Sequence, residues 1–250
     1  MCIEKQGATS HLVVEGYISF IGTCLSVCCY VAIICIYRTY KVLRNTGGLI
    51  GLIMCCCLLF SDSLHLVGSI IGITSNTLQS VCAAVGVLIH YGLLSAHLCS
   101  FILAYDIASK FGGGLPGQRN GQGHYKFCAL TFGLPLLIVT VSITLNYTHT
   151  FFIGYGERNM CFITNKEVLS IFHTLPVAMI TASNIAMVSC TLVQINRQQR
   201  ASKIALGQSS RSEVNVRQIA IRLIVIVGLT ELFGFVILPA DTANHGLLIL

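Results

Sequence analysis

Long apolar segments alternate with short polar ones along the whole chain. Six of them are long enough to be complete, and they cover residues 12–37, 47–73, 80–105, 127–147, 168–195 and 219–238. An α-helix needs about 20 apolar residues to cross a hydrocarbon layer of about 30 Å. A further apolar run at residues 246–250 reads as the start of a seventh span. The pattern predicts an all-α membrane protein, a seven-helix bundle with a truncated seventh helix, preceded by a short extracellular segment at residues 1–11.

The composition agrees with lipid as the solvent. Charged residues make up 10% of the chain and hydrophobic ones 54%, and the mean hydropathy is +0.79, whereas soluble domains carry about 25% charged residues. The apolar runs are continuous and about twice the length of a barrel strand, which favours helices over a membrane β-barrel. The net charge of +6 lacks the clustering with aromatic residues that nucleic-acid binding needs, so no nucleic-acid partner is expected.

Basic residues are concentrated on one side of the predicted membrane. Eleven of them follow spans one, three and five, whereas three lie on the opposite side. The eleven are Arg38, Lys41, Arg44, Lys110, Arg119, Lys126, Arg197, Arg200, Lys203, Arg211 and Arg217, and the three are Lys5, Arg158 and Lys166. Because basic loops stay in the cytoplasm, we expect a multi-pass plasma-membrane protein with its N-terminus outside. Arg222 lies near the inner end of the sixth span.

Most of the 13 cysteines lie inside spans, where a free thiol behaves as a small hydrophobe. Cys82 and Cys161 differ, because the predicted orientation places both outside the cell. An oxidising compartment permits a disulfide between them, and two separate surface thiols are the alternative. The bridge would close a loop of about 80 residues, which stabilises a fold by about 3–5 kcal/mol in the chain-entropy model.

Several short motifs follow one another in a characteristic order. The third span contains Leu88-Ile89-His90-Tyr91-Gly92-Leu93-Leu94-Ser95 and then Tyr105-Asp106-Ile107. The later motifs are Gly133-Leu134-Pro135, Cys161-Phe162, Pro176 with Asn184, and Gly228-Leu229-Thr230-Glu231-Leu232-Phe233-Gly234. In this order and spacing they resemble the adhesion/secretin family of G-protein-coupled receptors, with its Methuselah-like branch as one candidate.

The resemblance implies a receptor that couples an extracellular or tethered ligand to a heterotrimeric G-protein. Against the family pattern, this chain contains no tryptophan, and Cys99, Phe162 and Glu231 stand where the family usually has one. The family's helix-two histidine corresponds to Gly47. The sixth-helix tryptophan is expected to act in activation, so Glu231 calls conventional signalling into question.

Ionisable groups inside spans are costly and therefore need a role. The predicted intramembrane polar residues are Asp62, His65, His90, His97, Asn184 and Glu231. They are expected to face the bundle interior, either as a functional network or ligand pocket, or as ordinary interhelical hydrogen bonds of about 0.6 kcal/mol each. We hypothesise that Glu231 biases the resting state.

Two prolines, two glycines and one glycosylation sequon complete the candidate residues. Pro135 and Pro176 lie inside spans, where proline kinks a helix and frees carbonyl groups. Gly228 and Gly234 permit either close packing or hinge motion in the sixth span. Asn146-Tyr147-Thr148 is a glycosylation sequon close to the membrane surface.

Three classes of function remain open from the sequence. Signal transduction is favoured, and the basic third inner loop then offers a surface for a G-protein or for anionic lipid headgroups. A transporter or channel would line a path with Asp62, His90 and Glu231. A degenerate receptor that folds without signalling is the third class. We find no nucleophile–base pair, carboxylate pair or metal-ligand spacing, so neither enzyme activity nor a cofactor is expected.

Overall fold

The computed structural model describes residues 2–43, 46–74, 79–111, 122–148, 153–156 and 161–206. Its elements are α1 (Cys2–Thr39), the 3-10 turn η1 (Lys41–Leu43), α2 (Thr46–Thr74), α3 (Gln79–Phe111), α4 (Gln122–Tyr147), α5 (Lys166–Leu169), the π-helical segment η3 (Ser170–Thr174) and α6 (Leu175–Leu206). Five helical stretches are long and apolar enough to cross a membrane. The predicted fold class is confirmed, and the sixth span and the start of the seventh lie outside the described residues.

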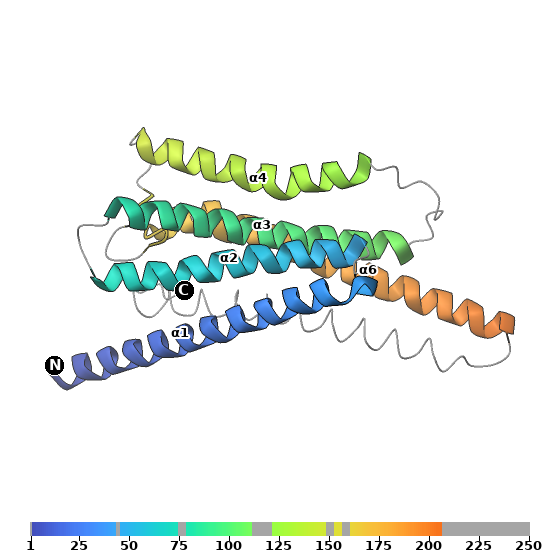
Figure 1. The fold of residues 1–250 in the computed structure, drawn as a ribbon, viewed down its shortest axis with the longest axis horizontal. Helices are drawn as coiled ribbons and strands as arrows, with labels where there is room; N and C mark the ends of the chain where they lie inside the picture. The colour runs from blue at the N-terminus through green and yellow to red at the C-terminus, as the bar shows by residue number, and fades with distance from the viewer. Residues whose placement is uncertain are drawn as a thin grey trace.

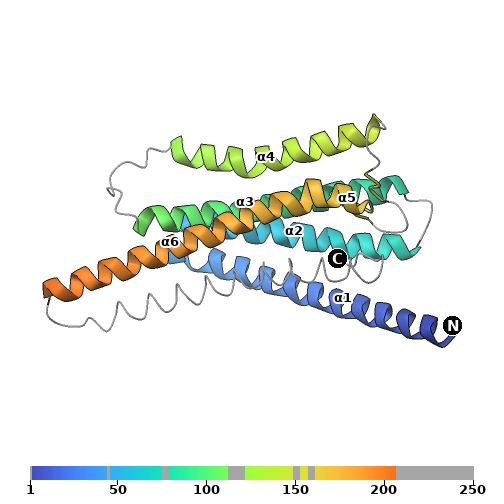
Figure 2. The ribbon, with the colours of Figure 1, turned by 180° about the vertical axis from the view of Figure 1, so that it is seen from behind.

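The helix α3 is the central element of the bundle. It packs against α2 on one side, against α6 on another and against α4 on a third, while α1 packs against α2. Figures 1 and 2 show this arrangement from opposite sides, with α4 at one edge and α1 at the other. The central position explains why α3 carries most of the fully buried side chains, among them His90, Leu94, Cys99 and Ile102.

The long helices all extend beyond the predicted spans, and α1 and α6 do so by the most. The helix α1 begins at Cys2 instead of Leu12, so the predicted segment at residues 1–11 is helical from its second residue. The helix α6 continues to Leu206, well beyond the predicted inner end of the fifth span at Ile195. Arg197, Arg200 and Lys203 therefore lie on a helix and not in a loop. The reason is local: Gln, Arg, Ala and Lys favour helices, and no Pro or Gly interrupts the stretch.

Buried hydroxyl groups inside the helices are satisfied locally. Ser61, Ser95, Ser142 and Thr191 each donate a hydrogen bond of 2.8–3.0 Å to the carbonyl oxygen four residues earlier. All four side chains are almost completely buried. Because lipid offers no hydrogen-bond partner, this back-bonding lets polar side chains sit in the bundle without a partner on another helix.

A glycine allows the chain between α4 and α5 to press against α3. A Cβ at Gly86 would lie 2.9 Å from the carbonyl oxygen of Cys161 and 3.1 Å from its carbonyl carbon. Real Cβ atoms do not approach backbone that closely, so the contact needs a residue without a side chain at this position.

We therefore expect Gly86→Ala to destabilise the protein by about 1–3 kcal/mol, the usual cost of overpacking. Thermal unfolding of the detergent-solubilised protein measures this as a lower Tm. Gly22→Ala in α1 is the matched control, because a Cβ there has no neighbour within 4 Å. Equal Tm values for the two variants would show that the loop does not rest on Gly86.

Candidate functional site

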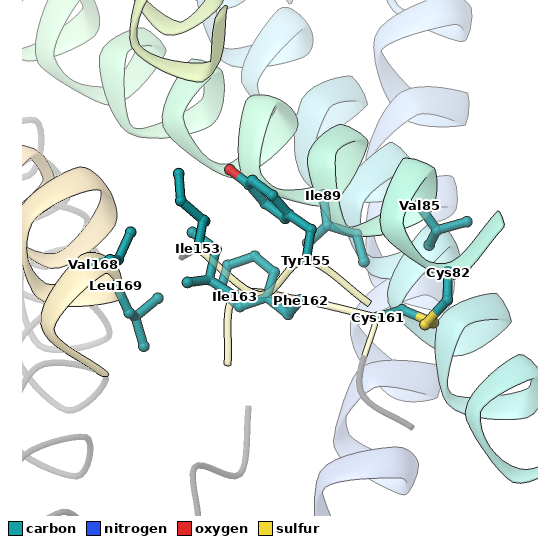
Figure 3. Close-up of a cluster of buried hydrophobic side chains, with 10 residues drawn as sticks. All are labelled: Cys82, Val85, Ile89, Ile153, Tyr155, Cys161, Phe162, Ile163, Val168 and Leu169. Atoms are coloured by element: carbon teal, nitrogen blue, oxygen red, sulfur yellow. A yellow bond between two sulfur atoms is a disulfide. The ribbon is translucent and has the colours of Figure 1, made fainter. Parts of the chain in front are cut away.

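A disulfide joins the start of α3 to the connection between α4 and α5. Cys82 and Cys161 are bonded, their Cα atoms are 4.6 Å apart, and both are buried. The predicted bridge is thus present. Figure 3 shows it at one end of a cluster of buried apolar side chains, with Val168 and Leu169 of α5 at the other end.

The connection folds into a small hairpin, formed by residues 153–156 and 161–165, which we call the loop hairpin. Tyr155 and Ile163 form an antiparallel bridge, and the Thr164 and Asn165 amides donate to the carbonyls of Gly154 and Ile153 at 3.4 Å. The carboxamide of Asn165 then caps α5 by accepting from the Glu167 and Val168 amides. Ile153 and Ile163 are almost fully buried, so the hairpin is part of the core.

His90 of α3 connects this hairpin to the fifth span. Its Nδ1 atom lies 2.8 Å from the hydroxyl of Tyr155, and its Nε2 atom lies 3.2 Å from the carbonyl oxygen of Phe172. A carbonyl can only accept, so Nε2 carries the proton and Nδ1 accepts from the tyrosine. Burial raises the pKa of Tyr155 to about 12. The phenol therefore stays protonated and can donate.

Pro176 explains why the Phe172 carbonyl is open to His90. In an α-helix this carbonyl would accept from the amide of residue 176, but proline has no N–H. The helix adopts a π turn over Ser170–Thr174 at this point, a feature often found at functional sites. The histidine thus supplies a donor to a carbonyl whose α-helical donor is missing at Pro176.

Aromatic and imidazole rings pack around the same histidine. The ring centroids of His90 and His173 are 5.4 Å apart, those of His90 and Phe162 6.2 Å, and those of Phe162 and His173 5.7 Å. All three pairs meet edge to face. We call His90, Tyr155, Phe162, Phe172 and His173 the imidazole cluster. It joins α3, the loop hairpin and the fifth span at one end of the bundle.

The other predicted polar residues lie elsewhere in the bundle. Asp62 and His65 are half-buried on α2 and interact electrostatically, with Tyr30 of α1 close to Asp62.

Asn184 is buried and donates from Nδ2 to the Ser100 hydroxyl at 3.1 Å, which links α6 to α3. His97 lies on α3 near His173. Among the predicted polar residues that the structure describes, His90 thus belongs to the imidazole cluster and His97 lies near it.

The remaining site predictions are placed as follows. Pro135 is buried inside α4, and the carboxamide oxygen of Asn146 accepts from the Ile153 amide at 3.1 Å. Arg38, Lys41 and Arg197 are exposed. Arg200 and Lys203 lie on α6. The predictions that fall outside the described residues are Arg44, Arg217, Arg222, Gly228, Glu231 and Gly234.

Three members of the imidazole cluster are not among the residues that the sequence predicts. Tyr155 and Phe172 carried no signal, because one lies in a loop and the other acts through its backbone. His173 did carry one, since an imidazole inside a span, three residues before a proline, marks a distorted helical turn. Asp106 is also fully buried, at 0% exposure, although the sequence indicates it only as part of the motif Tyr105-Asp106-Ile107.

Comparison with known proteins identifies the family. The sequence model described as 7 transmembrane receptor (Secretin family) matches residues 13–249, which is almost the entire chain. The chain belongs to the secretin family of seven-transmembrane receptors. This membership argues for a receptor and not an enzyme, and for a lipid bilayer as its surroundings.

Individual relatives of this secretin-family chain are adhesion receptors. Adhesion G protein-coupled receptor E2 of Rattus norvegicus is 30% identical over 185 residues, which are 70% of this chain and 18% of the relative. Adhesion G protein-coupled receptor L4 of Danio rerio is 23% identical over 242 residues, which are 97% of this chain and 32% of the relative. The chain therefore spans less than a third of the length of these relatives.

The hydrogen bond between His90 and Tyr155 can be tested with a double-mutant cycle. Tyr155→Phe leaves Nδ1 of His90 without a donor, and His90→Phe removes both of its bonds, so each change should lower the Tm. If the bond forms, the Tm of the double variant should fall by clearly less than the sum of the two decreases in the single variants. Tyr147→Phe, which alters a side chain that is 85% exposed, is the control. Additive losses would contradict the pairing.

Proposed function

We propose that this chain is the helical bundle of a receptor that passes a signal from outside the cell to a heterotrimeric G-protein. The observation that carries the proposal is the imidazole cluster. It holds a disulfide-anchored hairpin, the central helix and the fifth span together through a few directional contacts. A ligand that changes these contacts would shift the equilibrium between two arrangements of the bundle.

The fifth span provides the route to the opposite membrane face. It runs without a break in helical structure from Lys166 through the π turn to Leu206. A rearrangement at His173 would therefore move the far end of the same helix, where Arg197 is exposed and Arg200 and Lys203 follow. A π turn beside a proline is a suitable hinge, because the local hydrogen bonds are already irregular.

The orientation follows from the charge bias along the chain. With the N-terminus outside, the loop hairpin and its disulfide face the oxidising extracellular space, and the basic end of α6 faces the cytoplasm. An extracellular ligand could reach the hairpin only in the plasma membrane, which is the location we propose for the receptor. An extracellular or tethered ligand then reaches the hairpin first, and anionic lipids or a G-protein meet the basic end.

The coupling surface can be tested by removing its charge. In cells expressing the full chain, changing Arg197, Arg200 and Lys203 to glutamine should reduce basal G-protein activation at least about fivefold, because the inner face loses three positive charges. Sensors of G-protein dissociation for each subfamily measure this, and surface labelling checks expression.

Two controls separate coupling from general damage. Arg197→Lys with Arg200→Lys keeps the charge and should retain most activity, and Lys166→Gln changes an exposed charge at the opposite end of the same span. If the glutamine variant signals like the unmodified chain, the basic end serves lipid contact. If the unmodified chain activates no subfamily, the bundle folds without signalling and the proposal is wrong.

A further inference from the structure

Two cysteine thiols from different helices meet at a distance from the imidazole cluster. Cys57 of α2 and Cys99 of α3 share a side-chain hydrogen bond. Cys99 is almost completely buried and Cys57 is partly buried, and neither takes part in the disulfide described above. Two thiols in direct contact are suited to form a disulfide, because that bond needs a pair of cysteines whose side chains already approach each other.

The packing of α2 against α3 independently places these residues together. The two helices lie side by side in both views of the bundle (Figures 1 and 2). A Cβ at Gly92 of α3 would press on the side chain of Ser61 of α2, which marks one point of contact. A Cβ at Gly68 of α2 would touch Val85 of α3, which marks a second one. Residue numbers therefore fall along α2 while they rise along α3, so the helices are antiparallel.

The same register continues to the two cysteines. Cys57 lies four residues before Ser61 on α2, and Cys99 lies seven residues after Gly92 on α3. Both spacings keep a residue on the same face of a helix, so both cysteines stay in the interface. At 1.5 Å per residue, Cys99 is about 4–5 Å further along than Cys57. Helical side chains lean toward the N-terminus of their own helix, which in this antiparallel pair brings the two thiols together.

Only one of three consecutive cysteines on α2 faces α3 in this way. Cys55 is buried and lies close to Tyr30 of α1, whereas Cys56 is exposed. Neighbouring residues of an α-helix point about 100° apart, which explains the three different surroundings. Cys56 therefore provides a matched control for Cys57, with the same chemistry at nearly the same depth.

A further thiol lies near Cys99 on the side of α4. Thr131 of α4 makes a side-chain hydrogen bond with Cys99, and Cys128, three residues earlier on α4, is close enough to interact with Cys99 electrostatically. The hydrogen-bonded neighbour among the thiols is Cys57. Cys57 is thus the expected partner of Cys99, and Cys128 is the competing one.

We propose that Cys57 and Cys99 form a redox site that closes to a second disulfide when a hydroperoxide oxidises the pair. Cys57 is the more exposed of the two, so its sulfur takes one oxygen atom from the peroxide and becomes a sulfenic acid, while the rest of the peroxide leaves as water or an alcohol. The Cys99 thiol then attacks this sulfur. The S–S bond forms, the S–O bond breaks, and the hydroxyl group leaves with the Cys99 proton as water.

The second bridge would act on a different pair of elements from the first. The disulfide of Cys82 and Cys161 ties α3 to the loop hairpin, whereas a bridge between Cys57 and Cys99 would tie α3 to α2. Oxidation would thereby fix α2 against the central helix, and a thiol reductant would release it. This inference concerns the bundle itself and does not depend on whether the receptor signals.

A protease site between α2 and α3 makes the bridge measurable. In the full detergent-solubilised chain, cleavage at a site placed within residues 75–78 separates the part with Cys57 from the part with Cys99. The existing disulfide lies wholly in the second part and cannot join the two. After oxidation with hydrogen peroxide and blocking of remaining thiols with N-ethylmaleimide, most of the cleaved chain should migrate as one species without reductant. It should separate into two after treatment with dithiothreitol.

Serine variants assign the crosslink to this pair. Cys57→Ser and Cys99→Ser should each abolish it, whereas Cys56→Ser and Cys128→Ser should retain it. Peptide mapping of the oxidised, unmodified chain by mass spectrometry relies on no variant and should find Cys57 joined to Cys99. A crosslink that survives in Cys57→Ser or Cys99→Ser, or an oxidised chain in which mapping finds both cysteines as thiols, would overturn the proposal.

Discussion

The arrangement of the bundle depends on one rule of the membrane interior, that every backbone polar group needs a partner within the protein. Pro176 breaks that rule for the carbonyl of Phe172, and His90 restores it from a neighbouring helix. Because the histidine is committed to this carbonyl through one nitrogen, the other nitrogen is left to accept from Tyr155. The missing N–H of Pro176 thus favours the contact between His90 of α3 and Tyr155 of the loop hairpin.

Close packing holds the loop hairpin in place, in addition to its hydrogen bonds. Glycine at 68 and 86 lets Cys161 lie directly against α2 and α3, and Gly156 adopts a φ of +73° beside Ala83. These contacts leave little room for the hairpin to shift while the helices stay in place. A change in the hairpin therefore has to be accompanied by a change in the helices, which is what a receptor built on this site requires.

Different parts of the structure were accessible from the sequence to different degrees. The five described spans followed from hydropathy, because continuous apolar runs of this length have few other uses. The possibility of the disulfide followed from the expectation that both Cys82 and Cys161 lie on the oxidising side. The contact of His90 with Tyr155 could not be predicted, since it depends on how the hairpin folds back 65 residues later. The sequence underestimates the length of α6, which continues to Leu206, because hydropathy falls where the lipid ends whereas helix propensity does not.

The disulfide also divides the chain topologically. Residues 82–161 form a covalently closed ring that contains nearly all of α3 and the whole of α4. A single peptide-bond break within that ring, for example in the connection between the two helices, would leave both still tied to each other. The same break between α1 and α2 would separate two pieces that only non-covalent packing holds together. The helices joined through this ring thus stay linked after a cleavage within it, whereas a cleavage between α1 and α2 leaves packing alone to hold the two pieces together.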